Sequence, residues 1–416
     1  MTEETAAALR PYGAYQDGRL LRAGYTTGTC AAAAAQAALM TILTGKTPDA
    51  VSVRTPAGPE LLIEIEEDAG GSSGISACGA PAASGSPAVG GVPANAGASA
   101  VCGVRKDAGD DPDVTDGLLI LCEVRFVSGG EAEVEICGGE GIGRVTRPGL
   151  DQPVGEPAIN RVPRQMIREA VLAAMREQGA CGRVTVTVSA PEGAKAAEKT
   201  FNPRLGITGG ISILGTEGIV RPMSRAALVD TIRAELRVRV AEGGTVLAVP
   251  GSYGLGFLRE RYGLREAEPV IMSNFVGETV DAAAELKAPG LVLAGHLGKF
   301  VKLSGGIMNT HSREADCRME ILAAHALLCG ADRETALKLL RCGVTEEAAD
   351  LLEDAGLLKA VSGSLLKAAE DHLERRCGGR LPIGVILYTL KHGVLAESRN
   401  VGELLRDARG RRKAEA

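Results

Sequence analysis

Residues 24–38, with the sequence GYTTGTCAAAAAQAA, join two segments of opposite character at Cys30. Residues 24–29 are rich in glycine and threonine and favour a turn, whereas residues 31–38 are nearly all alanine, the residue with the highest helix propensity. The pattern predicts a helix that packs through a face of small side chains and has an unusually polar start.

The hydroxyl groups at this helix start allow two interpretations. The first N–H groups of a helix have no partner within it, so Thr26, Thr27 and Thr29 can cap them, and a turn through Gly28 lets the backbone approach an anion closely. The stretch is therefore either an ordinary capped helix or a seat for a carboxylate or phosphate, and these residues alone do not decide between the two.

Length and composition define the class of protein. A chain of 416 residues with 45% hydrophobic and 24% charged residues is typical of a globular protein of two domains. The net charge of -6 and an aromatic content of 3%, without tryptophan, argue against a nucleic-acid or membrane partner. The cysteines form no C-x-x-C pair and no signal segment opens the chain, so we expect reduced thiols and a cytoplasmic protein.

The first half of the sequence predicts an α+β domain with a mixed sheet over residues 21–222. Residues 1–20 lack periodicity and are expected to form a loose arm before it. Residues 51–68 alternate around a turn and predict a hairpin, and residues 69–100, almost entirely Gly, Ala, Ser and Pro, predict a flexible insertion. The other predicted elements are strands at 117–126, 131–136 and 183–191 and a helix at 163–177.

After residue 223 apolar strands alternate with helices, which predicts parallel βαβ units. The predicted strands are 245–251, 268–275 and 290–296, with helices at 224–244, 255–263 and 278–287, then several helices over 313–377 and a last strand at 383–389. We expect an α/β Rossmann-like domain with a mostly parallel sheet over residues 223–400, followed by a basic tail at 401–416.

Three segments at the carboxyl ends of these strands carry candidate functional residues, because ligands bind beyond that edge of an open parallel sheet. The segments are PGSYGLG (250–256), SNFVGE (273–278) and GHLGKFVKLSGGIMNTHS (295–312). Tight turns explain their glycines, but not the gathering of Ser273, Asn274, His296, Asn309, Thr310 and His311. The two histidines lack a third ligand at a recognisable spacing, so no protein-bound metal is expected, and a structural histidine is the alternative for each.

The first half offers three further candidates. The aspartate-rich segment 105–117 lacks the register of an EF-hand and is either a solvated turn or a rigid loop that faces a ligand. Arg144 and Arg147 follow a glycine run and suit a carboxylate. Residues 201–224 join the two halves, and their glycines predict a backbone-lined crevice at the domain junction.

Several strings, in the same order, resemble the cobalt-precorrin-5B C1-methyltransferase family of anaerobic cobalamin biosynthesis. They lie between about residues 20 and 330 and are LRAGYTTGTCAAAAAQAA, KDAGDDPDVTDG, GGEGIGRVTRPGL, GEPAINRVPRQMI, NPRLGITGGISILGTEGIVRPMS, SNFVGE and GHLGKFVKLSGGIMNTHSREAD. Two features depart from the family pattern: the insertion at 69–100 has no counterpart, and Ser252 stands where the family's loop usually has asparagine.

The resemblance implies transfer of the methyl group of S-adenosylmethionine to C-1 of a corrinoid, with cobalt present only as part of the substrate. The substrate carries several carboxylates, for which backbone N–H groups and cations are suitable partners. The candidate substrate residues are Thr26, Thr27, Thr29, Lys106, Arg144, Arg147, Arg204, Gly209 and Gly210. By analogy of fold, the candidate residues for S-adenosylmethionine are Gly251, Gly254, Ser273, Asn274, Gly295, Asn309 and Thr310. His311 or His296 is the candidate proton acceptor.

Two other classes of function stay open from the sequence. A non-catalytic carrier of tetrapyrrole intermediates needs seats for carboxylates but no site for S-adenosylmethionine. A dinucleotide-dependent oxidoreductase would use the same scaffold, but no G-x-G-x-x-G follows a strand with an acidic residue about 20 positions on. The oligomeric state is also open, a homo-oligomer included.

Overall fold

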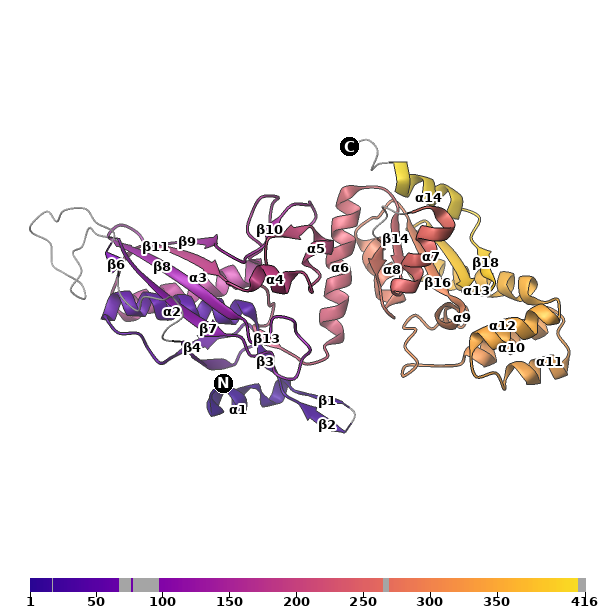
Figure 1. Ribbon diagram of the computed structural model, residues 1–416, viewed down its shortest axis with the longest axis horizontal. Helices are drawn as coiled ribbons and strands as arrows, with labels where there is room; N and C mark the ends of the chain where they lie inside the picture. Colours follow the sequence, from indigo (N-terminus) through magenta and orange to yellow (C-terminus); the bar gives the residue numbers. More distant parts are fainter. Residues whose placement is uncertain (17, 67–75, 78–96, 265–268, 411–416) are drawn as a thin grey trace, which may run out of the picture. The chain divides into compact units, whose positions relative to one another are not determined.

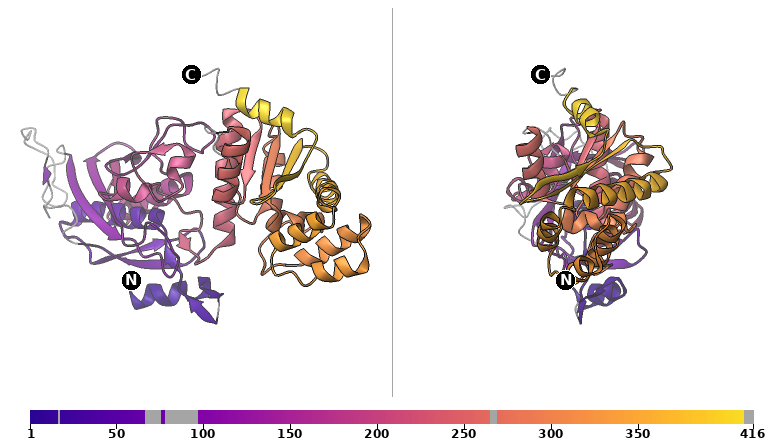
Figure 2. Two further views of the ribbon diagram at one scale, coloured as in Figure 1. Left: turned by 45° about the vertical axis from the view of Figure 1, so that its right-hand side comes forward. Right: turned by 90° about the vertical axis from the view of Figure 1, so that its right-hand side faces the viewer.

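The computed structural model describes residues 1–16, 18–66, 76–77, 97–264 and 269–410 (Figures 1 and 2). The chain divides into two compact units, Met1–Arg225 (unit 1) and Ala226–Ala416 (unit 2). The sequence analysis predicted the domain boundary between residues 222 and 223, three residues earlier. That the first half binds the substrate stays a prediction.

Unit 1 is built around one mixed sheet. Its elements are α1 (Glu3–Leu9), η1 (Arg10–Tyr12), β1 (Ala14–Gln16), β2 (Arg19–Leu21), β3 (Gly24–Tyr25), α2 (Thr27–Thr44), β4 (Ala50–Arg54), β5 (Glu60–Glu64), β6 (Ser76–Ala77), β7 (Ala98–Arg105), β8 (Leu119–Ser128), β9 (Glu133–Gly138), β10 (Arg144–Val145), α3 (Arg161–Glu177), β11 (Gly182–Ser189), α4 (Gly193–Ala197), α5 (Asn202–Leu205), β12 (Ile207–Thr208) and β13 (Ile219–Val220). The main sheet has the order β6-β7-β8-β11-β9, in which β9 and β11 are parallel and the other neighbours antiparallel. The mixed sheet is thus confirmed, and the hairpin expected at 51–68 is β4 with β5.

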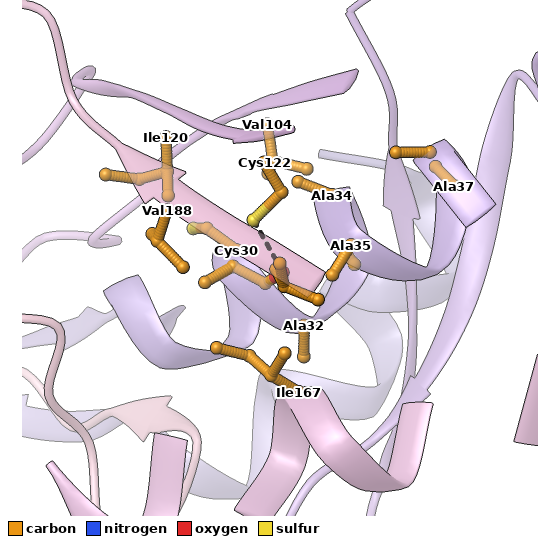
Figure 3. Packing of buried hydrophobic residues seen from close by; sticks show 14 of the residues in the cluster. Cys30, Ala32, Ala34, Ala35, Ala37, Val104, Ile120, Cys122, Ile167 and Val188 are labelled. Atoms are coloured by element: carbon orange, nitrogen blue, oxygen red, sulfur yellow. Dashed lines mark hydrogen bonds between the residues drawn. The ribbon is translucent and has the colours of Figure 1, made fainter. Parts of the chain in front are cut away.

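Helix α2 forms the centre of this unit. Buried and exposed positions alternate along β8, so only one face of the sheet needs cover. Figure 3 shows Cys30 and Ala34 toward Cys122 and Val104 of the sheet, and Ala32 toward Ile167 of α3. The Sγ of Cys122 donates to the carbonyl of Ala31 at 3.3 Å (Figure 3). Small side chains let the helix lie this close to its neighbours.

The length and composition of α2 would allow it to cross a membrane, but 83% of that apolar window is buried within the protein. It is the only such helix among the described residues. Burial on all sides by the protein's own core is the property of a core helix, so this helix gives no support for a membrane span.

Two sequence expectations for unit 1 need correction. Residues 1–20 are not a loose arm throughout, because α1 buries Leu9 in the core and the hydroxyl of Thr5 donates to the carbonyl of Leu62 at 2.6 Å. The expected insertion 69–100 includes the first residues of β7, which pair with β8 from Ala98 onward. Most of that insertion, residues 67–75 and 78–96, lies outside the described residues.

The remaining elements form unit 2. They are α6 (Arg225–Glu242), β14 (Val246–Val249), α7 (Ser252–Tyr262), β15 (Val270–Ile271), α8 (Val276–Glu285), β16 (Leu291–His296), α9 (Leu297–Ser304), α10 (Arg318–Leu328), α11 (Arg333–Leu339), α12 (Thr345–Asp354), α13 (Leu358–Cys377), β17 (Ile383–Thr389), β18 (Gly393–Glu397) and α14 (Val401–Gly410). The sheet has the order β15-β14-β16-β17-β18. All neighbours are parallel except β18, which the sequence analysis missed and which runs antiparallel to β17.

Helices cover both faces of this sheet. Leu247 and Val249 share a core with α7 and α14, whereas Val246 and Ala248 share another with α6, α8, α9 and α13. This double burial explains why the strands are continuous apolar runs. It also corrects the expected tail at 401–416: residues 401–410 are a helix whose Leu404 packs against the sheet, and residues 411–416 lie outside the described residues.

Candidate functional site

The order of strands in unit 2 defines a preferred position for a ligand. After β14 the chain crosses to β15 on one side, and after β16 it crosses to β17 on the other, although β14 and β16 are neighbours. The loops that leave their carboxyl ends therefore diverge, and ligands of open α/β sheets bind in the crevice at such a reversal. The first residues of α7 and α9 border this point, and we call it the strand-end edge.

The structure brings three of the predicted residues together at the strand-end edge. The backbone N–H of Thr310 donates to the carbonyl of Asn274 at 2.9 Å, and its hydroxyl lies 3.3 Å from Oδ1 of the same asparagine. Asn309 forms a β-bridge with Phe275. Next to them, Ser273 has a φ of 53°, a left-handed conformation that is uncommon for a residue with a side chain. Such local strain is typical of ligand-binding loops.

The three predicted glycines of this edge have different surroundings. A Cβ at Gly254 would lie 2.8 Å from that of Val249, and one at Gly295 would lie 2.1 Å from the ring of Phe300. Close packing therefore explains these two. At Gly251 a Cβ would meet nothing within 4 Å, so its backbone faces open space. Of the three, Gly251 alone has the open space that a ligand needs.

His296 has a structural task. Its Nδ1 accepts the N–H of Gly298 at 3.0 Å and so caps α9, and its Nε2 lies 2.8 Å from Oε1 of Glu346 on α12. Since Nδ1 accepts, the proton of the neutral ring is on Nε2 and is donated to the carboxylate. Both nitrogens are engaged, so the prediction of His296 as a proton acceptor is not supported by its contacts.

His311 is exposed on the loop before α10. Its Nδ1 accepts the N–H of Arg313 at 3.1 Å, and its own N–H donates to Oδ1 of Asn309 at 3.1 Å. In the neutral ring this leaves the proton on Nε2, so the ring must release Arg313 before Nδ1 can take up a proton. Its role as a proton acceptor stays a prediction.

Two lysines of α9 were missed by the sequence analysis. The side chain of Lys302 is 2% exposed, and its Nζ donates to the carbonyls of Thr310 at 3.1 Å and Ala315 at 2.8 Å, which holds the loop at the strand-end edge. Lys299 lies one turn earlier. The signal in the sequence was the K-x-x-K spacing of GHLGKFVK directly after a strand, which puts both on one side of a helix.

In unit 1 the predicted seat formed by threonines is occupied by the chain itself. The hydroxyl of Thr29 donates to the carbonyl of Gly218 at 2.7 Å, that of Thr27 accepts the N–H of Leu214 at 2.9 Å, and Oγ1 of Thr26 accepts the N–H of Thr29 at 3.3 Å. All three residues are buried. The contacts are those of the alternative interpretation, a capped helix, and these hydroxyls are not open to a ligand.

Lys106 and the aspartate-rich loop form a closed network. The ammonium of Lys106, buried, pairs with Asp113 and donates to the hydroxyl of Thr115 at 2.8 Å. The other carboxylates accept main-chain N–H groups: Asp116 from Ala108, Asp110 from Arg22, and Asp111 from Met223. These bonds make the loop rigid. The ammonium of Lys106 is engaged within the loop and does not face a substrate carboxylate.

The three arginines predicted as substrate residues lie around the short pair β10 and β12. Arg144 is exposed and uses Nη1 on the carbonyl of Gly155 at 2.9 Å, while the stem of Arg147 packs over Gly206, directly after α5 and its Arg204. Gly210 packs against the backbone of Gly141, and Gly209 has a φ of +84° with open space around it. Arg144, Arg147, Arg204 and Gly209 thus remain near one another on the same short elements.

Comparisons with known proteins agree on one family. Residues 14–222 match the CbiD family model, and residues 309–399 match the model of the CbiD C-terminal domain. The chain is 44% identical to the cobalt-precorrin-5B C(1)-methyltransferase of Ruminiclostridium cellulolyticum, with 90% of each chain covered. It is 40% identical to that of Methanocaldococcus jannaschii, over 89% of this chain and 95% of the relative.

The comparison with solved structures also finds a protein of the same kind. It is the cobalamin biosynthesis protein (cbiD) from Archaeoglobus fulgidus, which is 27% identical, covers 76% of this chain and 92% of its own, and has a TM-score of 0.38. The match to the family extends past residue 330, beyond the strings that carry the resemblance in the sequence, because the second family model matches up to residue 399.

Proposed function

The chain belongs to the CbiD family, and from this premise we propose that it is a cobalt-precorrin-5B C(1)-methyltransferase. It methylates C-1 of cobalt-precorrin-5B with S-adenosylmethionine and yields cobalt-precorrin-6A in anaerobic cobalamin biosynthesis. The observation that carries the proposal is that relatives named for this reaction are about two fifths identical over nearly the full chain, at 44% and 41% identity.

We propose the strand-end edge of unit 2 as the site for S-adenosylmethionine, which supplies a methyl group that is already activated for transfer. The protein then needs to bind, align and keep water away rather than to activate the donor. The reversal between β14 and β16 supports this place, as in other doubly wound, Rossmann-like sheets. Gly251, Ser273, Asn274, Asn309 and Thr310 are the residues that would hold the donor, and Gly254 and Gly295 shape the edge through packing.

The carboxylate arms of the substrate need cations, and Arg144, Arg147 and Arg204 are our candidates for them. A guanidinium has five N–H donors in a planar fork that fits a carboxylate. Arg144 is exposed and donates one hydrogen bond, from Nη1 to the carbonyl of Gly155, so its other N–H groups remain for a ligand. Because Thr27, Thr29 and Lys106 are engaged within the chain, we do not extend the proposal to them.

His311 is the proposed proton acceptor when the methylated ring loses a proton. The step transfers a proton from the corrinoid to Nδ1 of His311, after its bond to the N–H of Arg313 opens. Neutral imidazole is suited to this near pH 7. A full single-turnover rate in His311→Ala would remove His311 from the reaction.

The direct test incubates the purified protein with cobalt-precorrin-5B and S-adenosylmethionine labelled in the methyl group. We expect label in the corrinoid and stoichiometric S-adenosylhomocysteine. Arg144→Ala should raise the KM for the corrinoid several-fold, with the affinity for S-adenosylmethionine unchanged. A protein that binds the corrinoid tightly but neither binds S-adenosylmethionine nor transfers label would be the carrier instead.

The place of the reaction in the cell is also part of the proposal. The nine described cysteines are free thiols, several of them buried in the core. Burial raises the pKa of Cys30 to about 12, so this thiol is unreactive. Reduced, buried thiols are typical of cytoplasmic proteins, and we place the enzyme there.

A further inference from the structure

Lys299 is a half-buried cation for which the described part of unit 2 provides no anion. It is the third residue of α9, which begins directly after the carboxyl end of β16. Within the described residues its ammonium takes part in no hydrogen bond or ion pair. Three other lysines of this unit do have an anion: Lys338, Lys367 and Lys391 each pair with a carboxylate at 2.8 Å or less.

The surroundings of Lys299 add positive charge rather than compensate it. Burial, and then the ammonium of Lys302 one turn later, hold the pKa of Lys299 below its ordinary value. The carboxylate of Asp316 lies 4.0 Å from Lys302, but Arg318 binds it at 2.5 Å and neutralises it. A partly desolvated cation beside a second one is unfavourable unless an anion comes to it.

The position of Lys299 ties it to the strand-end edge. The Cα–Cβ bonds of a helix tilt toward its N-terminus, which for α9 is the end at β16. Lys302, on the same side of the helix, holds the loop that carries Thr310 through that residue's carbonyl. Lys299 is one turn closer than Lys302 to the carboxyl end of β16, and this places it at the strand-end edge.

We propose that Lys299 binds a ligand carboxylate at the strand-end edge, an inference that rests on the proposed function. A carboxylate can come from two sources there: the amino-acid end of S-adenosylmethionine or an acidic arm of the corrinoid. The lysine donates N–H bonds to the carboxylate oxygens, and no covalent step is involved. Lys299 is then a binding residue that selects for an acidic ligand.

The experiment compares Lys299→Met, Lys299→Arg and the control Lys359→Met, an exposed lysine of α13. Titration calorimetry measures the Kd of S-adenosylmethionine and of its decarboxylated analogue, and steady-state assays give the KM of cobalt-precorrin-5B. If the donor supplies the carboxylate, Lys299→Met raises the Kd of S-adenosylmethionine about tenfold and leaves the Kd of the decarboxylated analogue unchanged. If the corrinoid supplies it, only the KM of the corrinoid rises, by a similar factor. Lys299→Arg should recover part of either loss.

A second readout separates binding from a structural role. Without ligand, Lys299→Met should melt at the same temperature as the parent protein or higher, because it removes an uncompensated charge. A lower melting temperature, or unchanged Kd and KM in Lys299→Met, overturns the inference. Failure of the proposed function looks different: the parent protein itself then binds no S-adenosylmethionine and transfers no methyl group.

Discussion

Gly295 and Gly251 occupy the same edge of the unit 2 sheet but differ in what surrounds them. A Cβ at residue 295 would lie 2.1 Å from the ring of Phe300, whereas one at residue 251 would meet nothing within 4 Å. We expect Gly295→Ala to lower the free energy of unfolding by about 2 kcal/mol, through overpacking, and Gly251→Ala to leave it unchanged. Urea denaturation measures both.

The same pair tests the donor site. If Gly251 borders S-adenosylmethionine, Gly251→Ala weakens its binding in calorimetry although the fold is intact. Equal losses of stability in the two variants would contradict the difference in packing. An unchanged Kd of S-adenosylmethionine in Gly251→Ala would show that the donor does not bind at this loop.

The ion pair of Lys106 and Asp113 predicts a pH dependence of stability. Burial raises the pKa of Asp113, but the Lys106 ammonium and the hydrogen bonds from Thr115 outweigh it, so the pKa lies below the ordinary 3.8. A carboxylate whose pKa is lower in the folded than in the unfolded state contributes stability above its unfolded-state pKa. This contribution is lost as the pH falls through its folded-state pKa.

Asp113→Asn should therefore destabilise the protein at pH 7 by about 3 kcal/mol, since it leaves the buried Lys106 without its anion. The difference in unfolding free energy between the variant and the parent protein should shrink below about pH 4, because the parent protein then begins to lose the contribution of the ion pair. Denaturant unfolding at several pH values measures it. A difference that stays constant down to pH 3 would show that the pair does not titrate as described.

At the residue level, sequence patterns predicted which loops meet better than they predicted the surroundings of single residues. The spacing after strands correctly gathered Asn274, Asn309 and Thr310, because strand ends of a parallel sheet meet at one edge. The pattern could not tell a packing glycine such as Gly295 from an open one such as Gly251, since both occur at turns. That difference depends on Phe300, whose position follows from the tertiary fold.

At the scale of elements, the polar start of α2 is held by the segment 212–218 and not by a ligand. Thr27→Val removes the hydroxyl that accepts the N–H of Leu214 and keeps the shape of the side chain. We expect a loss of about 1–2 kcal/mol in unfolding free energy with the KM of the corrinoid unchanged. A raised KM at unchanged stability would instead restore the carboxylate seat.

Long elements with a clear hydrophobic periodicity were predictable from the sequence. Short elements, and those held in place by a few tertiary contacts, were not. The alternation of β8 and the apolar runs of β14, β16 and β17 gave strands close to those observed. The sequence predicts a basic tail in place of helix α14 because charged residues dominate the composition there, although Val401, Leu404 and Leu405 are buried. Helix α1 is held by the burial of Leu9 and by the hydrogen bond from Thr5 to Leu62, and neither contact produces a periodic signal in the sequence.

For the whole molecule, composition and pattern predicted two halves of different class, an expectation that matches the mixed and the mostly parallel sheet. They could not give the order β15-β14-β16-β17-β18, because strand pairing is decided by contacts far apart in the sequence. That order is what places the reversal at β14 and β16, so the strongest argument for the donor site comes from the structure. The matching family models then extend over both halves.

The measurement that tests this account most directly is amide hydrogen exchange of the whole protein with and without saturating S-adenosylmethionine. A bound donor should slow exchange in residues 250–256, 272–276 and 308–311, the three loops at the strand-end edge. The capped start of α2, residues 26–29, should be unaffected, since its bonds are already made within the chain. Protection confined to unit 1, or absent from all three loops at saturation, would contradict the assignment of the donor to unit 2.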